Sequence, residues 1–365
     1  MKRTLWSKRS LWSCAVLAGQ IGAFQHLPRS ARRYARCASL SAASDVARAG
    51  PTSDVARAPP PMRAFHPPEA KALTAHLTSG ALGPDERDAA IFAQITAEAR
   101  ELSGSSLLGG AVRAQVLESG SLAQCLAKIL ARRLGNARML PAPELEGHIE
   151  AALRDDPRPA HDIAEIVRKD PAAVSYLQTC LFLKGFHAVQ AQRVARTFWE
   201  RGDFEGQAVA FAIQNRVSEL WSVDVHPAAR LGGGLLMDHA TGIVIGETAV
   251  VGERCTILHS VTLGGTGKER GDRHPKIGDD VTLGAGSTVL GNIVVGDGAT
   301  VGSQAVCTRA VPPGMTVVGL NKLLDPNKDA EVKEVAKKRQ ETWQYELGVG
   351  GYGSYGGTGV QNWDI

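Results

Sequence analysis

A six-residue repeat of aliphatic side chains between Val223 and Val311 is the feature that most constrains the fold of this chain. After one interruption the repeat resumes with the same spacing. The first column of the repeat contains Ile245, Val251, Ile257, Leu263, Ile277, Leu283, Val289, Val295 and Val301. A period of six fits neither the 3.6-residue turn of an α-helix nor the alternation of a simple strand. It is typical of a hexapeptide parallel β-helix, in which short strands and turns wind into a prism.

A second column of small or aliphatic residues lies two positions earlier in each repeat. Its members are Ile243, Ala249, Cys255, Val261, Val281, Ser287, Ile293, Ala299 and Ala305. Because each coil of a solenoid packs on the next, two such columns fill one continuous core. Cys255 and Cys307 fall on these columns, and the cysteines show no metal-like spacing. We therefore expect both to be small buried hydrophobic residues rather than disulfide partners or metal ligands.

The residues before the repeat predict a helical domain. Apolar residues recur at three and four positions through residues 68–222. The expected fold is therefore α+β, with a helical domain at 68–222 and a parallel β-helix at 223–318. Residues 319–365 are expected to hold a short charged helix, a glycine-rich tether and a C-terminal tail.

The N-terminal residues 1–63 have the composition of a targeting sequence and linker. They hold eleven Lys or Arg and two Asp or Glu, a net charge of +9, whereas the remaining residues carry a net charge of −5. The basic balance thus gives no support for a nucleic-acid-binding body. The apolar run LWSCAVLAGQIGA is too short to cross a membrane. The segment resembles either a bipartite plastid presequence or a plain mitochondrial or plastid presequence, and we expect an organellar location, with plastid preferred and cytoplasm if the presequence is misread.

Two departures from the repeat are the candidate chemical sites. His239 stands in the stretch MDHATG at a column position that otherwise suits apolar residues, beside Asp238 and fifteen residues after Asp224. A histidine with a carboxylate partner is the usual arrangement of a general base. A structural histidine is the alternative interpretation at this point.

The second departure is an insert of eight residues between Leu263 and Ile277. It contains GGTGK, which lacks the spacing of a phosphate-binding P-loop. Arg273 and Lys276 within or beside it could pair with anionic groups. The alternative is an ordinary solvated loop.

The residues of these regions resemble the serine O-acetyltransferase family of hexapeptide-repeat acyltransferases. The resemblance rests on HPAARLGGGLLMDHATGIVIGETAVVG, SVTLGGTG, GDRHPKIG and LGAGSTVLGNI, and on DPAAVSYLQTCLFLKGFHAVQAQRVA in the helical part. It implies a helical domain followed by a left-handed β-helix, assembled as trimers and commonly hexamers. It also implies acetyl transfer from acetyl-CoA to the L-serine hydroxyl in cysteine biosynthesis, without a metal or a permanently bound cofactor.

The resemblance further implies a role for each matching residue. His239 would be the general base and Asp224 its carboxylate partner. The serine-binding residues would be Asp238, Asp170, Arg273 and His274. Acetyl-CoA would lie near Gly265, Thr266, Ala285 and Ser303. Trp363, Asp364 and Ile365 would bind O-acetylserine (thiol)lyase, as the C-terminal isoleucine does in this family.

Three alternatives remain open on the sequence. One is a hexapeptide acyltransferase with another acceptor. Another is a γ-type carbonic anhydrase, for which His226, His239, His259 and His274 could supply ligands but without the expected pair of histidines five residues apart. A third is a non-catalytic scaffold that carries the tail to its partner.

Overall fold

The structure is a computed structural model that describes residues 77, 83–268 and 270–324. All of the described residues belong to one unit of the chain, Ala64–Ile365. Several expected features lie outside the described residues: the presequence and linker, the charged helix expected after Leu324, the glycine-rich tether and the tail residues Trp363, Asp364 and Ile365. Within the described part, no helix has the length and apolar character needed to cross a bilayer.

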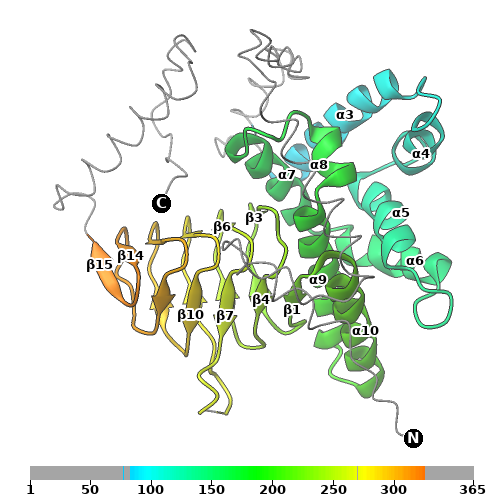
Figure 1. The fold of residues 1–365 in the computed structure, drawn as a ribbon. Coiled ribbons are helices and arrows are strands. Elements are labelled where there is room, and N and C mark those ends of the chain that lie inside the picture. The colour runs from blue at the N-terminus through cyan, green and yellow to red at the C-terminus, as the bar shows by residue number, and fades with distance from the viewer. Residues whose placement is uncertain (1–76, 78–82, 269, 325–365) are drawn as a thin grey trace, which may run out of the picture. The chain divides into compact units, whose positions relative to one another are not determined.

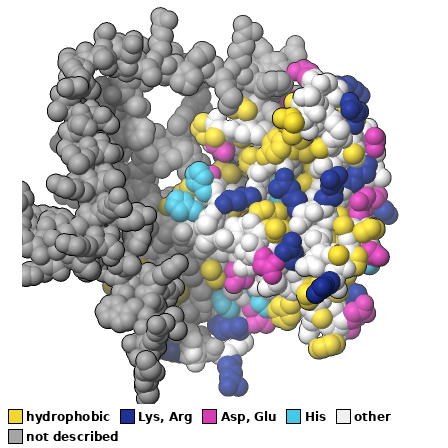
Figure 2. Space-filling model, turned by 45° about the vertical axis from the view of Figure 1, so that its right-hand side comes forward, with side chains coloured by type: hydrophobic (Ala, Val, Ile, Leu, Met, Phe, Trp, Pro, Cys, Tyr) yellow, Lys and Arg dark blue, Asp and Glu magenta, His cyan; other side chains and the backbone are white. Residues whose placement is uncertain are grey.

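Helices form the first part of the described chain, as the apolar spacing predicts. They are α3 (Pro84–Leu102), α4 (Gly109–Val112), the π-helix η2 (Arg113–Leu117), α5 (Leu122–Leu134), α6 (Ala142–Leu153), α7 (Arg158–Lys169), α8 (Tyr176–Phe182), α9 (Lys184–Glu200) and α10 (Phe204–Trp221). The N-caps of α5, α8 and α10 are Ser121, Ser175 and Asp203, and each side chain accepts a backbone N–H of the first turn. Helix α9 packs along α10, and α5 packs on α6. Figure 2 shows basic and acidic side chains interspersed over the helical side of the molecule.

Short parallel strands follow and build a three-sided prism (Figure 1). The first face contains β1 (Asp224–Val225), β4 (Val244–Ile245), β7 (Thr262–Gly264), β10 (Thr288–Leu290) and β13 (Val306–Cys307). The second contains β2 (Arg230–Leu231), β5 (Val250–Val251), β8 (Lys276–Ile277) and β11 (Val294–Val295). The third contains β3 (Leu236–Met237), β6 (Thr256–Ile257), β9 (Thr282–Leu283), β12 (Thr300–Val301), β14 (Thr316–Val318) and the antiparallel β15 (Lys322–Leu324).

The first column of the sequence repeat is the core of this prism. The register pairs Ile245 with Leu263 and Leu263 with Val289, so each inward side chain stacks on its counterpart in the next coil. Leu263 and Val289 are fully buried. Cys255 and Cys307 are also buried and free, as expected from their columns. The predicted left-handed β-helix fold is thereby confirmed.

Three corners join the faces of the prism. The His239 corner contains the turns after β3, β6, β9 and β12, which lead from the third face to the first. The Arg273 corner contains the turns after β1, β4 and β7, which lead from the first face to the second, including the insert that projects beside β7 (Figure 1). The acidic corner joins the second face to the third. Its carboxylates Glu253, Asp279 and Asp297 each accept the backbone N–H of the preceding coil at 2.8 to 2.9 Å.

One correction concerns the place of His239 in the repeat. Counting back six residues from Ile245 predicts that His239 occupies the inward column. The register instead puts Met237 there, paired with Ile257 and 4% exposed. Two extra residues in the turn after β3 move His239 out to the corner, where 71% of its side chain is exposed. The repeat is therefore longer in the first coil than in the following one.

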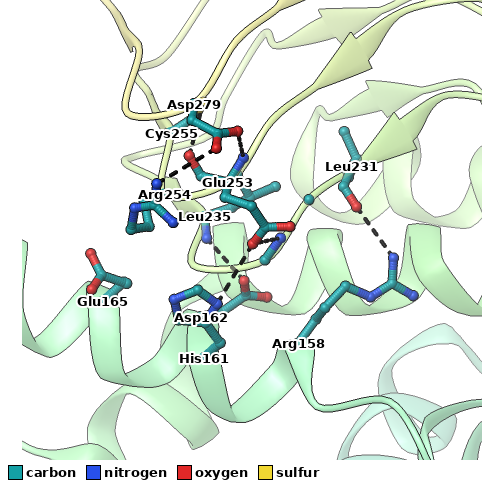
Figure 3. A network of polar contacts seen from close by, with 12 residues as sticks. Arg158, His161, Asp162, Glu165, Leu231, Leu235, Glu253, Arg254, Cys255 and Asp279 are labelled. Atoms are coloured by element: carbon teal, nitrogen blue, oxygen red, sulfur yellow. Dashed lines mark hydrogen bonds and ion pairs between the residues drawn. The ribbon is translucent and has the colours of Figure 1, made fainter. Parts of the chain in front are cut away.

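Helices α7 and α9 close the end of the prism at which the first coil lies. This coil has no preceding coil to satisfy its backbone groups, so other partners are required. Arg193 on α9 donates to the carbonyl of Gly232 (2.7 Å), and Arg196 donates to that of Ala228 (2.7 Å). On α7, the Asp162 carboxylate accepts the N–H of Leu235 (2.9 Å), as Figure 3 shows. The helical domain thus acts as the cap of the β-helix.

Asp162 is also the centre of a buried charged network. Its side chain and that of Arg193 are 0% and 1% exposed and form an ion pair. Gln190 on α9 donates a further hydrogen bond to Asp162 (2.8 Å). A buried charge is tolerated only when it is paired and fully hydrogen-bonded, and this network meets that requirement for Asp162 with donors from α9 and from the prism.

Candidate active site

The turn that carries His239 has an unusual backbone. His239 and Ala240 both adopt left-handed conformations, with φ of 56° and 55°. Two tight hydrogen bonds of 2.6 Å close the turn, from Ala240 N to Asp238 O and from Thr241 N to His239 O. Ala240 is fully buried and anchors the turn, whereas the imidazole of His239 faces outward. Left-handed non-glycine residues cost about 1 kcal/mol or more each, so this turn needs support from its surroundings.

Two carboxylates that the sequence predicts to bind serine lie at this turn. The Asp238 carboxylate is 3.5 Å from Nε2 of His239. Asp170 follows the last residue of α7, and its carboxylate accepts the N–H of Ala172 (2.8 Å). Burial raises the pKa of Asp170, the negative charge of Asp238 raises it further, and His239 opposes the shift. The structure therefore brings Asp170, Asp238 and His239 together at the His239 corner.

Asp224 lies beside the same corner but has a different partner. It is on β1 at the edge of the first face, where its N–H donates to the carbonyl of Ile243 (2.9 Å). Its carboxylate accepts a hydrogen bond from Nε2 of Gln214 on α10 (2.6 Å). The ion-pair partner of His239 within the described residues is Asp238. Asp224 is thus near the predicted base without contacting it in this state.

Arg273 and His274 lie at the opposite edge of the first face, in the Arg273 corner. The guanidinium of Arg273 binds the carboxylate of Glu247 (2.7 Å). The hydroxyl of Thr248 accepts the backbone N–H groups of Arg273 (3.0 Å) and His274 (3.1 Å). The Nδ1 atom of His274 in turn accepts the N–H of Thr248 (3.1 Å). All these bonds are made between neighbouring coils of the prism.

The surroundings of His274 and His226 in this corner favour their neutral forms. Burial lowers the pKa of His274, and the adjacent Arg273 lowers it further. Burial also lowers the pKa of His226, whose ring packs edge-on against Trp199 and Phe211 at 5.0 and 5.7 Å between centroids. Because Nδ1 of His274 is an acceptor, its Nε2 carries the proton and can donate to a ligand.

The residues predicted to contact acetyl-CoA are divided between the two corners. Ala285 and Ser303 lie in turns stacked along the His239 corner, where the N–H of Gln304 donates to the carbonyl of Ala285 (2.8 Å). Gly265 and Thr266 begin the insert at the Arg273 corner. One chain therefore presents half of the predicted site on each edge of its first face, with that face between them.

Several residues near these clusters were absent from the predicted site. His259 stacks one coil beyond His239, and their ring centroids are 5.8 Å apart. Glu247 and Thr248 hold Arg273 and His274. His259 is twenty residues after His239, and the two extra residues in the turn after β3 put it outside a regular count of six per strand. The bonds of Thr248 to the insert have no signal in the sequence, because the insert interrupts the repeat.

The arrangement has the parts required for proton removal and for binding an ion of either sign. His239 is an exposed imidazole with an adjacent carboxylate, and Asp170 and Asp238 form a negative pair. Arg273 offers a planar guanidinium for a carboxylate. Among the described residues, no three His, Cys, Asp or Glu side chains form a group that could hold a metal ion.

Comparison with known proteins identifies the family. The family model "Serine acetyltransferase, N-terminal" matches residues 91–191, and the bacterial transferase hexapeptide model matches residues 274–309. Serine acetyltransferase 2 of Arabidopsis thaliana is 44% identical over 239 residues, 64% of this chain and 73% of the relative. The Salmonella typhimurium enzyme is 43% identical over 242 residues, 65% of this chain and 87% of the relative. Serine acetyltransferase 3, mitochondrial, of Arabidopsis thaliana is 42% identical over 242 residues, 64% of this chain and 61% of the relative.

Solved structures give the same result. Soybean serine acetyltransferase complexed with serine is 42% identical, with a TM-score of 0.62 over 65% of this chain and 99% of that one. The Brucella abortus serine acetyltransferase in complex with coenzyme A is 40% identical, with a TM-score of 0.61 over 64% of this chain and 95% of that one. These matches span both the helices that carry Asp170 and the prism that carries His239. The chain therefore belongs to the serine acetyltransferase family, EC 2.3.1.30, as its sequence motifs predict.

Proposed function

We propose that this enzyme transfers the acetyl group of acetyl-CoA directly to the hydroxyl of L-serine, with His239 as the general base. The observation that carries the proposal is the gathering of Asp170, Asp238 and His239 at one exposed corner of the prism. The relatives named above include one solved with serine and one solved with coenzyme A, which supports the two substrates.

In the proposed reaction, the serine hydroxyl oxygen attacks the thioester carbonyl carbon while His239 takes the hydroxyl proton. The C–S bond then breaks, and the proton passes from His239 to the departing sulfur, which gives O-acetyl-L-serine and CoA. No covalent enzyme intermediate is needed, because holding both substrates together makes the attack effectively unimolecular. The backbone N–H groups of Gly265 and Thr266 are candidates to stabilise the oxyanion.

Asp224 is proposed to become the carboxylate partner of His239. It lies beside the His239 corner, and its present partner is the neutral amide of Gln214 on the surface. A negative carboxylate stabilises the imidazolium that forms when His239 takes a proton, which a neutral amide cannot do. We expect substrate binding to rotate the Asp224 carboxylate and the His239 imidazole toward each other.

The remaining predicted residues are proposed to bind substrates. Asp170 and Asp238 carry the negative charges that suit the serine ammonium, and Arg273 has the geometry to bind its carboxylate. His274 donates from Nε2 beside the acceptor. Acetyl-CoA is proposed to lie near Gly265, Thr266, Ala285 and Ser303.

The division of the site between two corners supports a trimer. One chain places Asp170 and His239 on one edge of the first face, and Arg273 and His274 on the other. If the prisms associate side by side about a threefold axis, each His239 corner can meet the Arg273 corner of a neighbour. Assembly of trimers into hexamers through the helices is proposed by family resemblance.

Two further proposals concern regions outside the described residues, and a third concerns the division of the chain into domains. Residues 1–63 are proposed to be an organellar presequence, plastid first and mitochondrial as the alternative; the relative named as mitochondrial makes an organelle reasonable. Trp363, Asp364 and Ile365 are proposed to bind O-acetylserine (thiol)lyase. We also retain the division into a presequence, a helical domain at 68–222, a β-helix at 223–318 and a tail segment at 319–365.

The test of the mechanism is thiol release from acetyl-CoA with and without L-serine. His239→Ala should lose about 10²- to 10⁴-fold in kcat, the usual contribution of a general base. Asp224→Asn should lose most of kcat with less effect on the KM for serine. Full activity of His239→Ala would refute the proposed base, and equal rates with other hydroxyl acceptors would refute the serine assignment.

A further inference from the structure

We propose that Lys184, at the first turn of α9, is a positioning residue that holds the catalytic turn by bonding to Thr241. The inference rests on the proposed role of His239 as the base. Lys184 was not among the predicted site residues; it lies on α9, and its partner Thr241 is two residues after His239 in the turn.

The first observation is that the position of His239 depends on its backbone. Its imidazole is 71% exposed, so few packing contacts restrain the side chain. The backbone beneath it is left-handed at both His239 and Ala240. Such a turn relaxes when its supports are removed, because each of these conformations is intrinsically unfavourable.

The second observation is a hydrogen-bonded chain from α9 to this backbone. The ammonium of Lys184 donates to the hydroxyl of Thr241. That hydroxyl donates to the carbonyl of His239 (3.3 Å), and the N–H of Thr241 donates to the same carbonyl (2.6 Å). Lys184 therefore orients the hydroxyl that closes the turn.

The third observation is that α9 is fixed closely enough to make this bond. A Cβ atom added to Gly185 would be 2.0 Å from the backbone carbonyl oxygen of Met237, the last residue of β3. The start of α9 and the strand that leads into the turn therefore touch backbone to backbone. This contact sets the distance that the Lys184 side chain has to span.

The same helix is anchored to the rest of the first coil. Arg193 binds the carbonyl of Gly232 in the acidic corner, and Arg196 binds that of Ala228 in the Arg273 corner. Through Lys184, α9 reaches the His239 corner as well. The helical domain thus supports the catalytic turn directly, in addition to closing the prism.

The experiment is a double-mutant cycle on the full chain. Lys184→Met keeps the aliphatic stem and removes the ammonium, and Thr241→Val keeps the shape and removes the hydroxyl. Each should lower kcat about tenfold, because small misplacement of a catalytic group has effects of this size or larger. The KM values for serine and acetyl-CoA should stay within about twofold, since substrate contacts are kept. The double variant should be no slower than the slower single variant.

Lys184→Arg should restore most of kcat, because it keeps a cationic donor. The matched control is Arg158→Met, which removes another helix-to-prism bond, from Arg158 to the carbonyl of Leu231 (3.2 Å), at a corner that carries no proposed site residue (Figure 3). It should leave kcat unchanged. A purely structural role for Lys184 predicts instead that Lys184→Met and Arg158→Met both lower the melting temperature. In that case kcat would not fall selectively while KM stays constant.

The outcomes separate the inference from the proposed function. If His239→Ala is inactive while Lys184→Met and Thr241→Val keep full kcat, the positioning role is wrong and the base stands. If the losses of the two single variants multiply in the double variant, the two residues do not act through one bond and the inference is overturned. If His239→Ala keeps full activity, both the assignment of His239 as the base and the positioning role of Lys184 are wrong. Thr241→Val decides the question on its own if Lys184→Met does not fold.

Discussion

The two edges of the first face support their functional side chains in different ways. At the Arg273 corner, His274 is 7% exposed and is held by Thr248 and Gly246 of the coil stacked beside it. At the His239 corner, the imidazole is 71% exposed and is carried by a strained turn that α9 supports from the helical domain. One corner is held by bonds between neighbouring coils of the prism, and the other by a contact with a helix.

This difference shows where each half of the site is vulnerable. Arg273 and His274 should respond mainly to changes inside the prism, because their bonds are made to Glu247 and Thr248 of the neighbouring coil. The His239 corner should respond to changes in α9.

Of the changes that test this difference between the corners, Gly246→Ala inside the Arg273 corner should have the largest effect. The added Cβ would be 2.0 Å from Nε2 of His274 and 2.1 Å from its Cδ2, so the ring must move. We expect kcat/KM for serine to fall about a hundredfold, because a group displaced by about 1 Å no longer meets its substrate. Steady-state kinetics with saturating acetyl-CoA measures this.

Gly147→Ala on α6 is the control, because an added Cβ there meets nothing within 4 Å. It should leave kcat/KM unchanged. Unchanged kinetics in Gly246→Ala would mean that His274 does not contact the acceptor.

The next effect should come from Gly185→Ala, which acts on the support of the His239 corner. The new methyl group would meet the carbonyl oxygen of Met237 at 2.0 Å, and a backbone atom cannot move aside cheaply. We expect a loss of about 2 kcal/mol in the free energy of unfolding, within the range for overpacked sites. Urea unfolding measures the loss. The kcat of the folded protein should fall while the KM for serine changes little, and the reverse pattern would contradict the comparison.

A smaller loss in the free energy of unfolding is expected when the pH is lowered, through protonation of His187 on α9. Burial lowers its pKa to about 4, although its hydrogen bond to the carbonyl of Cys180 (2.7 Å) opposes the shift. The folded state therefore prefers neutral His187, and its stability is complete above the ordinary pKa of about 6.5 and is lost as the pH falls from there toward 4. Between pH 7.5 and 5.5 this group alone should remove about 1 kcal/mol from the free energy of unfolding.

The measurement is the free energy of unfolding against pH for the chain and for His187→Gln. The glutamine amide can still donate to Cys180 but does not titrate. The difference between the two curves isolates His187 from the other histidines whose pKa burial lowers. Parallel curves would show that His187 is accessible to protons without opening of α9.

The smallest effect is expected at the acidic corner, which carries no proposed site residue. Arg254 forms an ion pair with Asp280 (2.7 Å), and both side chains are well exposed to solvent. Because exposed ion pairs contribute little, Arg254→Met should change the free energy of unfolding by less than about 1 kcal/mol. Its kcat should equal that of the unchanged chain. A larger loss would mean that this corner transmits strain to the others.

The β-helix could be predicted from the sequence because each six-residue repeat corresponds to one strand and one turn of the prism. A side chain such as Leu263 recurs every six residues for one physical reason, the stacking of coils, so its burial follows from counting. The family motifs then placed Asp170 and Asp238 near His239, although they lie on different elements. That gathering at one corner is present in the structure.

The remaining features depend on local exceptions and on contacts between domains. His239 was assigned to the inward column because counting assumed a constant period, and two extra residues in the first coil move it to the corner. Ile293, expected in the second column, is only partly buried. The bond from Lys184 to Thr241 joins residues far apart in sequence, and no periodicity reports such a pair.

The buried Asp162 has a consequence for how this protein unfolds. Its carboxylate takes donors from α9 and from the backbone of the first coil, while it stands on α7 itself. If either the helices or the prism came apart alone, a charge would be left in an apolar interior without its full set of partners, which is strongly unfavourable. The helical domain and the β-helix should therefore melt in one cooperative transition, although repeat proteins often unravel coil by coil.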